Sequence, residues 1–323
     1  FILENYDETN PINELRSRSA ITYKGPKGIN SDRAFSLDKR GITKSMIGSV
    51  GISATETGAT GIVKQLTLNP RITSTRGFID PPKDDKEIDD IPTSSLLTAE
   101  EAAIPFITHD DPKRIGYSSG QSKHVIPANE FDVPLVGTGF EQTLAYKVSD
   151  SFGFKAKADG KVVLLDKAKN FLVIKYKDGT CDRVEFGKSY NRNSDFFLQN
   201  NLDVNVHQGQ IVKQGDLITY NKDFFKRRSD NKLIFTQGAM ARVAIHEGEV
   251  TEDDSTGVSY RIAGKLACAV IKKKQIVLGP NSNIVRIASI GDFVRYGDPL
   301  MIYEDSKDNE SDMSLLALLG DAD

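Results

Sequence analysis

The second half of the chain is a succession of short apolar runs divided by Gly, Asp and Asn, and this pattern limits the fold more than any other feature. Residues 160–165, 171–176 and 181–186 are rich in Val, Leu, Ile, Phe and Tyr, and residues 177–180, Lys-Asp-Gly-Thr, separate the last two runs. Asp-Gly suits the positive φ angles of a tight hairpin turn. From about residue 125 onward, the sequence therefore predicts strands joined by turns.

One pattern occurs twice in this half of the chain. Residues 209–218 and 291–300 share Gly-x-x-Val-x-x-Gly-Asp and end on apolar residues. Each copy predicts a turn, a short apolar strand, a Gly-Asp turn and a second strand. Two copies are too few to indicate a solenoid.

Charge and cysteine content exclude several classes of protein. The 323 residues contain 42 Lys and Arg against 45 Asp and Glu, so a uniformly basic nucleic-acid-binding protein is excluded, whereas local basic stripes are not. Cys181 and Cys268 form no C-x-x-C motif, which argues against a disulfide scaffold and a zinc ribbon. No apolar run approaches the roughly 18 residues of a membrane helix, so we expect no membrane partner. Because the chain begins with Phe1, we expect it to be processed, truncated or one piece of a longer polypeptide.

The first half of the chain is dense in Gly, Ser and Thr up to about residue 75, which predicts loops and short strands. Residues 80–92 combine prolines with a run of acids and predict a solvated linker. Thr98-Ala99-Glu100-Glu101 is a capping-box pattern that predicts a short helix beginning at Thr98, and Pro105 limits it to about Ala103.

Residues 104–114 contain one imidazole, two adjacent carboxylates and two cations. A metal site formed by His109 and the aspartates is disfavoured, because adjacent aspartates point in different directions and no third ligand follows at helical spacing. A capped loop with surface ion pairs is a second interpretation. In a third, Arg114 is positioned to bind a phosphate, which its planar guanidinium matches through two hydrogen bonds. The residues alone leave these interpretations open.

Two further segments have a structural and a functional interpretation each. Asp253-Asp254-Ser255 is either a solvated turn or a source of carboxylate near a magnesium–phosphate complex. Residues 16–33 are either a solvent-exposed loop or a surface that follows a nucleic-acid backbone. The cations of this second segment are Arg16, Arg18, Lys24, Lys27 and Arg33.

Signatures of a complete catalytic centre are missing from the sequence. It contains no G-x-x-x-x-G-K-[ST], no G-x-S-x-G and no H-E-x-x-H. The D-x-D-x-D motif that would hold a catalytic magnesium in a nucleotide polymerase is also missing. We therefore expect no complete catalytic centre in this chain.

Several segments, in collinear order, resemble the central part of the β subunit of bacterial multisubunit RNA polymerase. They are Asn10-Pro11-x-x-Glu14, Ile21-x-x-x-Gly25-Pro26-x-Gly28, residues 104–114 (I-P-F-x-x-H-D-D-x-x-R), residues 134–141 (P-L-V-G-T-G-x-E), the two Gly-x-x-Val-x-x-Gly-Asp segments, and Ala241-Arg242-Val243-Ala244 leading to residues 253–255. The upstream lobe and the later part of such a subunit, with its two active-site lysines, have no counterpart here. The heavy divergence implies a split version from a giant bacteriophage.

The resemblance implies a mixed α+β, β-rich fold, with a fork and rifampicin-pocket lobe followed by part of a double-psi β-barrel with sandwich-hybrid-like insertions. The implied regions are a rifampicin-pocket and fork-loop region (1–79), an acidic linker (80–95), the start of the catalytic barrel region with the H-D-D-x-x-R segment (96–145), a β-rich barrel and sandwich-hybrid region (146–303), and an acidic flexible tail with a short leucine-rich helix (304–323).

The implied activity is that of DNA-directed RNA polymerase, a nucleotidyltransferase to which this chain contributes one wall of the active-site cleft without being catalytic alone. The implied partners are a β′-type subunit whose D-x-D-x-D holds the catalytic magnesium, other β fragments, DNA template, RNA transcript and nucleoside triphosphates. The implied location is the cytoplasm of an infected bacterial host, or the virion.

Individual positions acquire roles through the same resemblance. Arg114 matches an arginine near the incoming triphosphate, and Asp111 an aspartate close to it. Asp253 and Asp254 match a Glu-Asp pair near the second magnesium, with Asp254 acting through water and Asp253 one methylene shorter than the usual glutamate.

The basic positions acquire roles in nucleic-acid binding. Lys123 and His124 match an Arg-Gln pair that faces the RNA end of the hybrid. Residues 25–33 match the fork loop, where Lys27 and Arg33 would contact DNA phosphate without reading bases.

Two other functions remain open at this point. The paired Gly-x-x-Val-x-x-Gly-Asp units also resemble biotinyl and lipoyl carrier domains, which present a lysine next to methionine. None of Met46, Met240, Met301 or Met313 is followed directly by Lys. The other alternative is a structural assembly subunit without catalytic contacts.

Overall fold

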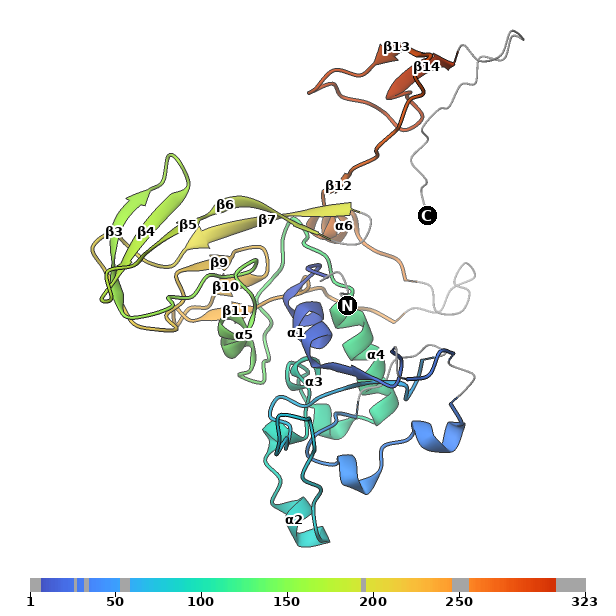
Figure 1. Ribbon diagram of the computed structural model, residues 1–323, viewed down its shortest axis with the longest axis vertical. Coiled ribbons are helices and arrows are strands. Elements are labelled where there is room, and N and C mark those ends of the chain that lie inside the picture. The colour runs from blue at the N-terminus through green and yellow to red at the C-terminus, as the bar shows by residue number, and fades with distance from the viewer. Residues whose placement is uncertain are drawn as a thin grey trace. The chain divides into compact units, whose positions relative to one another are not determined.

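The structure is a computed structural model that describes residues 7–25, 28–31, 35–52, 59–192, 196–245 and 256–305. The chain divides into two compact units, residues 1–272 and 273–323 (Figure 1). Among the described residues, no helix combines the length and apolar character required to cross a membrane. The leucine-rich helix expected near the C-terminus lies outside the described residues.

The described helices are short, and most belong to the first half of the chain (Figure 1). The α-helices are α1 (Pro11–Ser19), α2 (Asp85–Asp89), α3 (Ala99–Ala102), α4 (Pro112–Lys123), α5 (Glu141–Lys147) and α6 (Tyr260–Leu266), and the 3-10 helices are η2 (Leu37–Arg40), η3 (Lys44–Met46), η4 (Thr93–Ser95) and η5 (Ile107–His109).

The strands form small antiparallel sheets, which confirms the predicted mixed α+β class. Their bounds are β1 (Ala20–Thr22), β2 (Val63–Gln65), β3 (Gly160–Asp166), β4 (Phe171–Tyr176), β5 (Cys181–Glu185), β6 (Gly187–Arg192), β7 (Phe196–Val204), β8 (Ile211–Val212), β9 (Thr219–Asn221), β10 (Phe225–Arg227), β11 (Leu233–Phe235), β12 (Val270–Lys272), β13 (Ser282–Ile287) and β14 (Met301–Asp305).

The larger sheets each contain four strands. One has the order β5-β4-β3-β8, and the other has the order β12-β7-β6 with β9 also pairing with β7. The pairs β1-β2, β10-β11 and β13-β14 are separate. No sheet of the described strands closes into a barrel, so the double-psi barrel, the sandwich-hybrid insertions and the regional boundaries stay predictions.

The predicted strands and hairpin are confirmed between residues 160 and 185. Phe171 pairs with Glu185 and Lys175 with Cys181, and Gly179 between β4 and β5 has the expected positive φ of 90°. The predicted helix at Thr98 is also confirmed, with a full capping box: Thr98 Oγ1 accepts from Glu101 N at 3.3 Å, and Glu101 Oε2 accepts from Thr98 N at 2.7 Å.

The prediction of strands from residue 125 fails between residues 126 and 159, which contain α5 and loops. Residues 141–147, Glu-Gln-Thr-Leu-Ala-Tyr-Lys, favour a helix by propensity and bury Leu144 and Ala145 against the core. The expectation of loops and short strands up to residue 75 also missed helix α1. Its signals are the Asn10 N-cap and Pro11 in the first turn.

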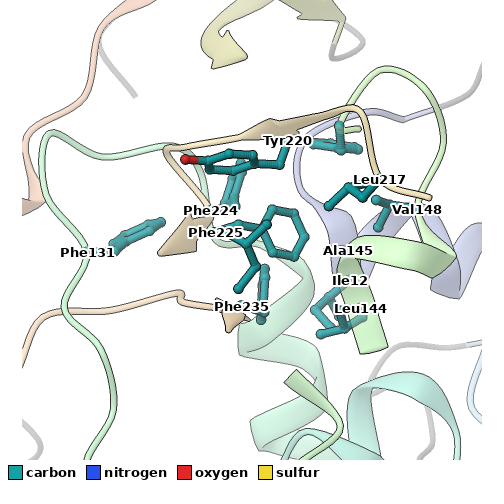
Figure 2. Close-up of a cluster of buried hydrophobic side chains, with 12 residues drawn as sticks. Ile12, Phe131, Leu144, Ala145, Val148, Leu217, Tyr220, Phe224, Phe225 and Phe235 are labelled. Atoms are coloured by element: carbon teal, nitrogen blue, oxygen red, sulfur yellow. The ribbon is translucent and has the colours of Figure 1, made fainter. Parts of the chain in front are cut away.

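The main hydrophobic core is formed by residues from the beginning and from the later part of the first unit. Ile12 of α1 and Leu144 of α5 pack with a group of phenylalanines from residues 131–235 (Figure 2). Phe224 lies at its centre, with ring centroids 5.8 Å from Phe131, 6.0 Å from Phe152 and 6.2 Å from Phe235. A second core lies against the sheet β5-β4-β3-β8 and includes Val162, Leu172, Ile174 and Val212.

The Asn10-Pro11-x-x-Glu14 motif is a clamp between distant segments. Asn10 Oδ1 accepts from Asn13 N at 2.9 Å and caps α1, while Asn10 Nδ2 lies 2.8 Å from the Lys123 carbonyl and 2.7 Å from the Val125 carbonyl. Asn10 therefore satisfies carbonyls at the end of α4 that the helix itself leaves open.

Glu14, one turn further along α1, forms the second half of this clamp. Its buried carboxylate accepts from Ser149 N at 3.0 and 2.9 Å and from Arg18 at 2.9 Å. α1 is thus hydrogen-bonded both to α4 and to the segment that leads into the sheets.

Asn10→Asp is expected to lower the free energy of unfolding by about 2–4 kcal/mol, because the capping oxygen stays while the NH donor to buried carbonyls is lost. Urea denaturation measures the change. Asn13→Asp is the matched control on the same helix, where an acid in the first turn should cost nothing. Equal stability of both variants would contradict the clamp.

A buried ion pair links α1 to α3. Arg16 lies 2.9 Å from Glu100 Oε1, and their side chains are 8% and 0% exposed. The second carboxylate oxygen of Glu100 has no hydrogen-bond partner among the described residues. Burial raises the pKa of Glu100 above its ordinary value of 4.5, and the nearby Arg16 cation opposes this shift.

Arg16→Met is expected to cost about 3–5 kcal/mol of stability, because it leaves the Glu100 carboxylate buried and unpaired, and Arg16→Met/Glu100→Met should recover most of the loss. The pKa of Glu100 is higher in the folded than in the unfolded state. The stability that follows from this shift is therefore fully present below pH 4.5 and is lost as the pH rises through the folded-state pKa. The double variant should therefore lack this fall in stability. Denaturation measured across pH tests both expectations, and a double variant as unstable as the single one would refute the pairing.

Candidate nucleic-acid interface

The H-D-D-P segment builds the start of helix α4. Asp110 Oδ1 accepts from Asp111 N at 2.9 Å, and Asp111 Oδ1 accepts from Arg114 N at 2.9 Å as the N-cap. Pro112 occupies the first helical position, where its missing N–H costs nothing. Asp111 thus positions Arg114 through the main chain and leaves the guanidinium unengaged by this bond.

Helix α4 has two distinct faces. Its buried face includes Ile115, Ser119 and Ser122, and α4 packs against α1 and α3. The exposed face carries a stripe at intervals of three or four residues, which places its side chains one above another on a helix. We call this the α4 stripe, and it consists of Lys113, Tyr117, Gln121 and His124.

Arg114 and Lys123 flank the α4 stripe on opposite sides. Arg114 is exposed, and within the part of the chain that the structure describes no carboxylate is paired with its guanidinium. Lys113 Nζ lies 6.0 Å from the centre of the Tyr117 ring, which places a cation beside an exposed aromatic surface. The face therefore offers cations and a stacking surface together.

His124 follows α4 as its C-cap and is exposed. Partial desolvation of its ring where it meets the protein, followed by the charges of Lys123 and Arg16, lowers the pKa of His124 below its ordinary value. The shift favours the neutral imidazole, which can hydrogen-bond or stack.

The remaining predicted residues have different surroundings. Arg16 forms the buried ion pair with Glu100 and is therefore not available to bind nucleic acid. Arg18 donates to Glu14 and, at 2.8 Å, to the Lys147 carbonyl. Lys24 is exposed. A Cβ at Gly28 would lie 2.1 Å from the Tyr23 carbonyl oxygen, so this close approach requires glycine at position 28.

Lys27, Arg33, Asp253 and Asp254 lie outside the described residues. Over the described ranges, no group of three His, Cys, Asp or Glu side chains could hold a metal ion. The described residues thus supply no complete magnesium site, and the expected role of Asp254 stays a prediction.

The P-L-V-G-T-G-x-E segment organises a turn beside residues 102–105. The Glu141 carboxylate accepts from Thr138 N and Gly139 N, each at 2.8 Å, and Thr138 Oγ1 donates to the Ala102 carbonyl at 2.6 Å. A cavity of about 240 Å³ lies here, lined in part by Pro105, Pro134 and Glu141. This motif therefore ties the start of α5 to the segment that precedes the H-D-D residues.

Sequence reasoning missed Lys113, Tyr117 and Gln121. Helix α4 itself was not predicted, because residues 112–123 contain two glycines and three serines, which weaken helical propensity. The available signal was the Asp-Pro pair at residues 111–112, which is typical of an N-cap followed by the first helical residue.

No family model matches the chain. The curated relatives include the DNA-directed RNA polymerase subunit beta of Desulfatibacillum aliphaticivorans, 24% identical over 274 residues that cover 66% of this chain and 20% of that protein. The subunits beta of two strains of Thermus thermophilus are each 24% identical over 269 residues, covering 66% of this chain and 23% of each relative.

The chain spans about a fifth of the length of these curated relatives. The match extends over two thirds of the chain and agrees with the resemblance seen in its motifs. The chain is distantly homologous to the β subunit of bacterial RNA polymerase.

Proposed function

We propose that this chain is part of the β-type subunit of a multisubunit DNA-dependent RNA polymerase and forms one wall of its active-site cleft. The observation that carries the proposal is the exposed face of α4, where Arg114 follows a carboxylate-capped helix start and the α4 stripe runs beside it. The distant homology supports it, because the H-D-D-x-x-R segment is among the motifs that resemble this subunit.

On this proposal, the α4 face contacts phosphate and base by different means. Arg114 neutralises and orients the incoming triphosphate, since a guanidinium can bind two phosphate oxygens at once. Lys113 and Lys123 contact the phosphate backbone, and Tyr117 offers a surface on which a base can stack. These contacts position the nucleic acid without reading its sequence.

The partners and the metal follow from the same proposal. Magnesium would supply positive charge to the RNA 3′ hydroxyl and to the leaving pyrophosphate, and a β′-type partner would supply most of the ligands of the metal. Other β fragments, DNA, RNA and nucleoside triphosphates complete the assembly in the cytoplasm. Origin in a giant bacteriophage stays a prediction, because the relatives named above are bacterial.

A structural assembly subunit is the second candidate, and one observation favours it. Asn10, Glu14 and Glu141 lie in motifs that resemble the polymerase, yet all three hold the fold together. Substitution of Arg114 distinguishes the two candidate functions, because its guanidinium has no ion-pair partner among the described residues and so no such contact to lose.

In the polymerase assembled with this chain, Arg114→Ala is expected to lower kcat/KM for nucleoside triphosphates by about tenfold or more, because a charge contact to phosphate is lost. Arg261→Ala, at an exposed arginine of α6, is the matched control. Elongation kinetics measure the effect, and size-exclusion chromatography checks that the complex stays intact. Unchanged kinetics in the Arg114 variant would favour the structural alternative.

Lys113→Gln is expected to weaken binding of an RNA–DNA hybrid to the assembled polymerase, whatever the sequence of the hybrid. The slope of the logarithm of the binding constant against the logarithm of the salt concentration should fall in magnitude by about one, because one phosphate contact is lost. Lys167→Gln, in the exposed turn between β3 and β4, is the control. Filter binding across a salt series gives the slope. Identical slopes for both variants would remove Lys113 from the interface.

A further inference from the structure

Helix α5 and the β10-β11 hairpin border a polar pocket whose residues belong to none of the motifs discussed above. α5 packs against β11 (Figure 1). The pocket has a volume of about 370 Å³, within the roughly 300–1,000 Å³ that is typical of small-molecule sites. We call it the α5 pocket, and its polar lining consists of Gln142, Tyr146, Asn205, Arg227, Asn231 and Lys232. All of these residues belong to the first unit, which therefore forms the pocket by itself.

Neutral oxygen atoms hold the side chain of Arg227 in this pocket. Its Nη1 donates to the main-chain carbonyl and to Oδ1 of Asn231, at 3.0 and 3.3 Å, and its Nη2 donates to Asn205 Oδ1. Asn205 Nδ2 donates to the Leu217 carbonyl at 2.8 Å, which fixes the orientation of its amide. The guanidinium also lies 5.7 Å from the centre of the Tyr220 ring. Arg227 is therefore ordered before a ligand binds, and this lowers the entropic cost of binding.

The positive charge of Arg227 has no counter-charge in contact with it. No carboxylate forms an ion pair with Arg227 among the described residues. The nearby Asp230 is paired with Arg228, and Asp203 accepts from the Tyr220 hydroxyl at 3.4 Å. The three hydrogen bonds of Arg227 also do not use all five N–H groups of a guanidinium. This arrangement suits an anion, and a phosphate best matches the planar guanidinium.

The rest of the lining suits a nucleobase. Tyr146 is 50% exposed, and Gln142 precedes it by four residues on α5, so the two side chains are neighbours on one face of the helix. A tyrosine ring offers a surface on which any base can stack, and a glutamine amide can both donate and accept a hydrogen bond. Lys232 adds a second cation to the same pocket.

We propose that the α5 pocket binds a nucleoside phosphate, with the phosphate on Arg227 and Lys232 and the base on Tyr146. The ligand is either a free nucleotide or one nucleotide of a single strand, because both present the same phosphate and base. No residue of α4 or of the H-D-D segment lines the pocket. The inference therefore goes beyond the proposed function and does not depend on it.

Titration of the full chain with adenosine monophosphate tests the contribution of Arg227. Arg227→Gln is expected to raise the dissociation constant about tenfold or more, because a charge-assisted contact to phosphate is lost. Arg183→Gln is the matched control, since Arg183 lies 4.5 Å from the Phe171 ring centre but already has Glu185 as an ion-pair partner at 3.4 Å. Equal affinity of the two variants would overturn the proposal, as would equally tight binding of citrate, an anion without phosphate.

A second variant separates recognition of the base from recognition of the phosphate. Tyr146→Leu keeps a good helix former on α5 and leaves the hydrogen bonds of Arg227 intact. It is expected to weaken binding of adenosine monophosphate about fivefold or more and to leave binding of inorganic phosphate unchanged. Unchanged affinity for adenosine monophosphate would reduce the pocket to a simple anion site and overturn the proposal.

A short oligouridylate distinguishes the two sources of the ligand. Tighter binding of the oligouridylate than of uridine monophosphate, lost in Arg227→Gln, would identify a single strand as the ligand, and equal affinities would identify a free nucleotide. Binding of neither would overturn the proposal. The elongation kinetics of Arg114→Ala decide the proposed polymerase function separately, because Arg114 lies outside the α5 pocket.

Discussion

The hydrogen bonds of the Asn10 and Glu14 side chains hold the first unit together. Asn10 caps α1 and donates to carbonyls at the end of α4, and Glu14 binds the main chain at Ser149. These contacts join residues more than 110 positions apart, next to a core in which Ile12 packs against the phenylalanines. A short helix thereby positions α4, whose exposed face is the candidate site.

Burial separates the basic residues into two groups. Arg16 stabilises the fold through Glu100, whereas Arg114 and Lys113 extend from an exposed helix. Arg16 lies between two motifs that resemble the polymerase β subunit, and Lys113 and Arg114 lie within a third, so resemblance alone does not distinguish a structural cation from one that can meet a phosphate. The energetic reason is that a desolvated charge requires a partner inside the protein, while an exposed one remains available.

Burial also separates the apolar residues of the two Gly-x-x-Val-x-x-Gly-Asp segments into two groups. Both copies of Gly-x-x-Val-x-x-Gly-Asp close their turns with glycine and aspartate, and only one finds a neighbouring strand among the described residues. The exposed valine and leucine of the second copy lose the hydrophobic stabilisation that their equivalents gain.

Local sequence signals predicted those structural features that depend only on residues close together in the chain. The capping box at Thr98, the Asp-Gly hairpin and the strands between residues 160 and 185 follow from propensity and turn chemistry, which act over a few positions. The Asp-Pro start of α4 was readable in the same way but was overlooked, and with it Tyr117 and the rest of the α4 stripe.

The sequence by itself determined the turns, the caps, the mixed α+β class and the likeness to the polymerase subunit, because each depends on residue types at short spacing. Only the tertiary structure decided which side chains face solvent. Arg16 is removed from the candidate interface by Glu100, 84 positions away, and Val212 is covered by β3 while Val294 is not. Burial is a property of contacts between distant segments, and no local pattern contains it.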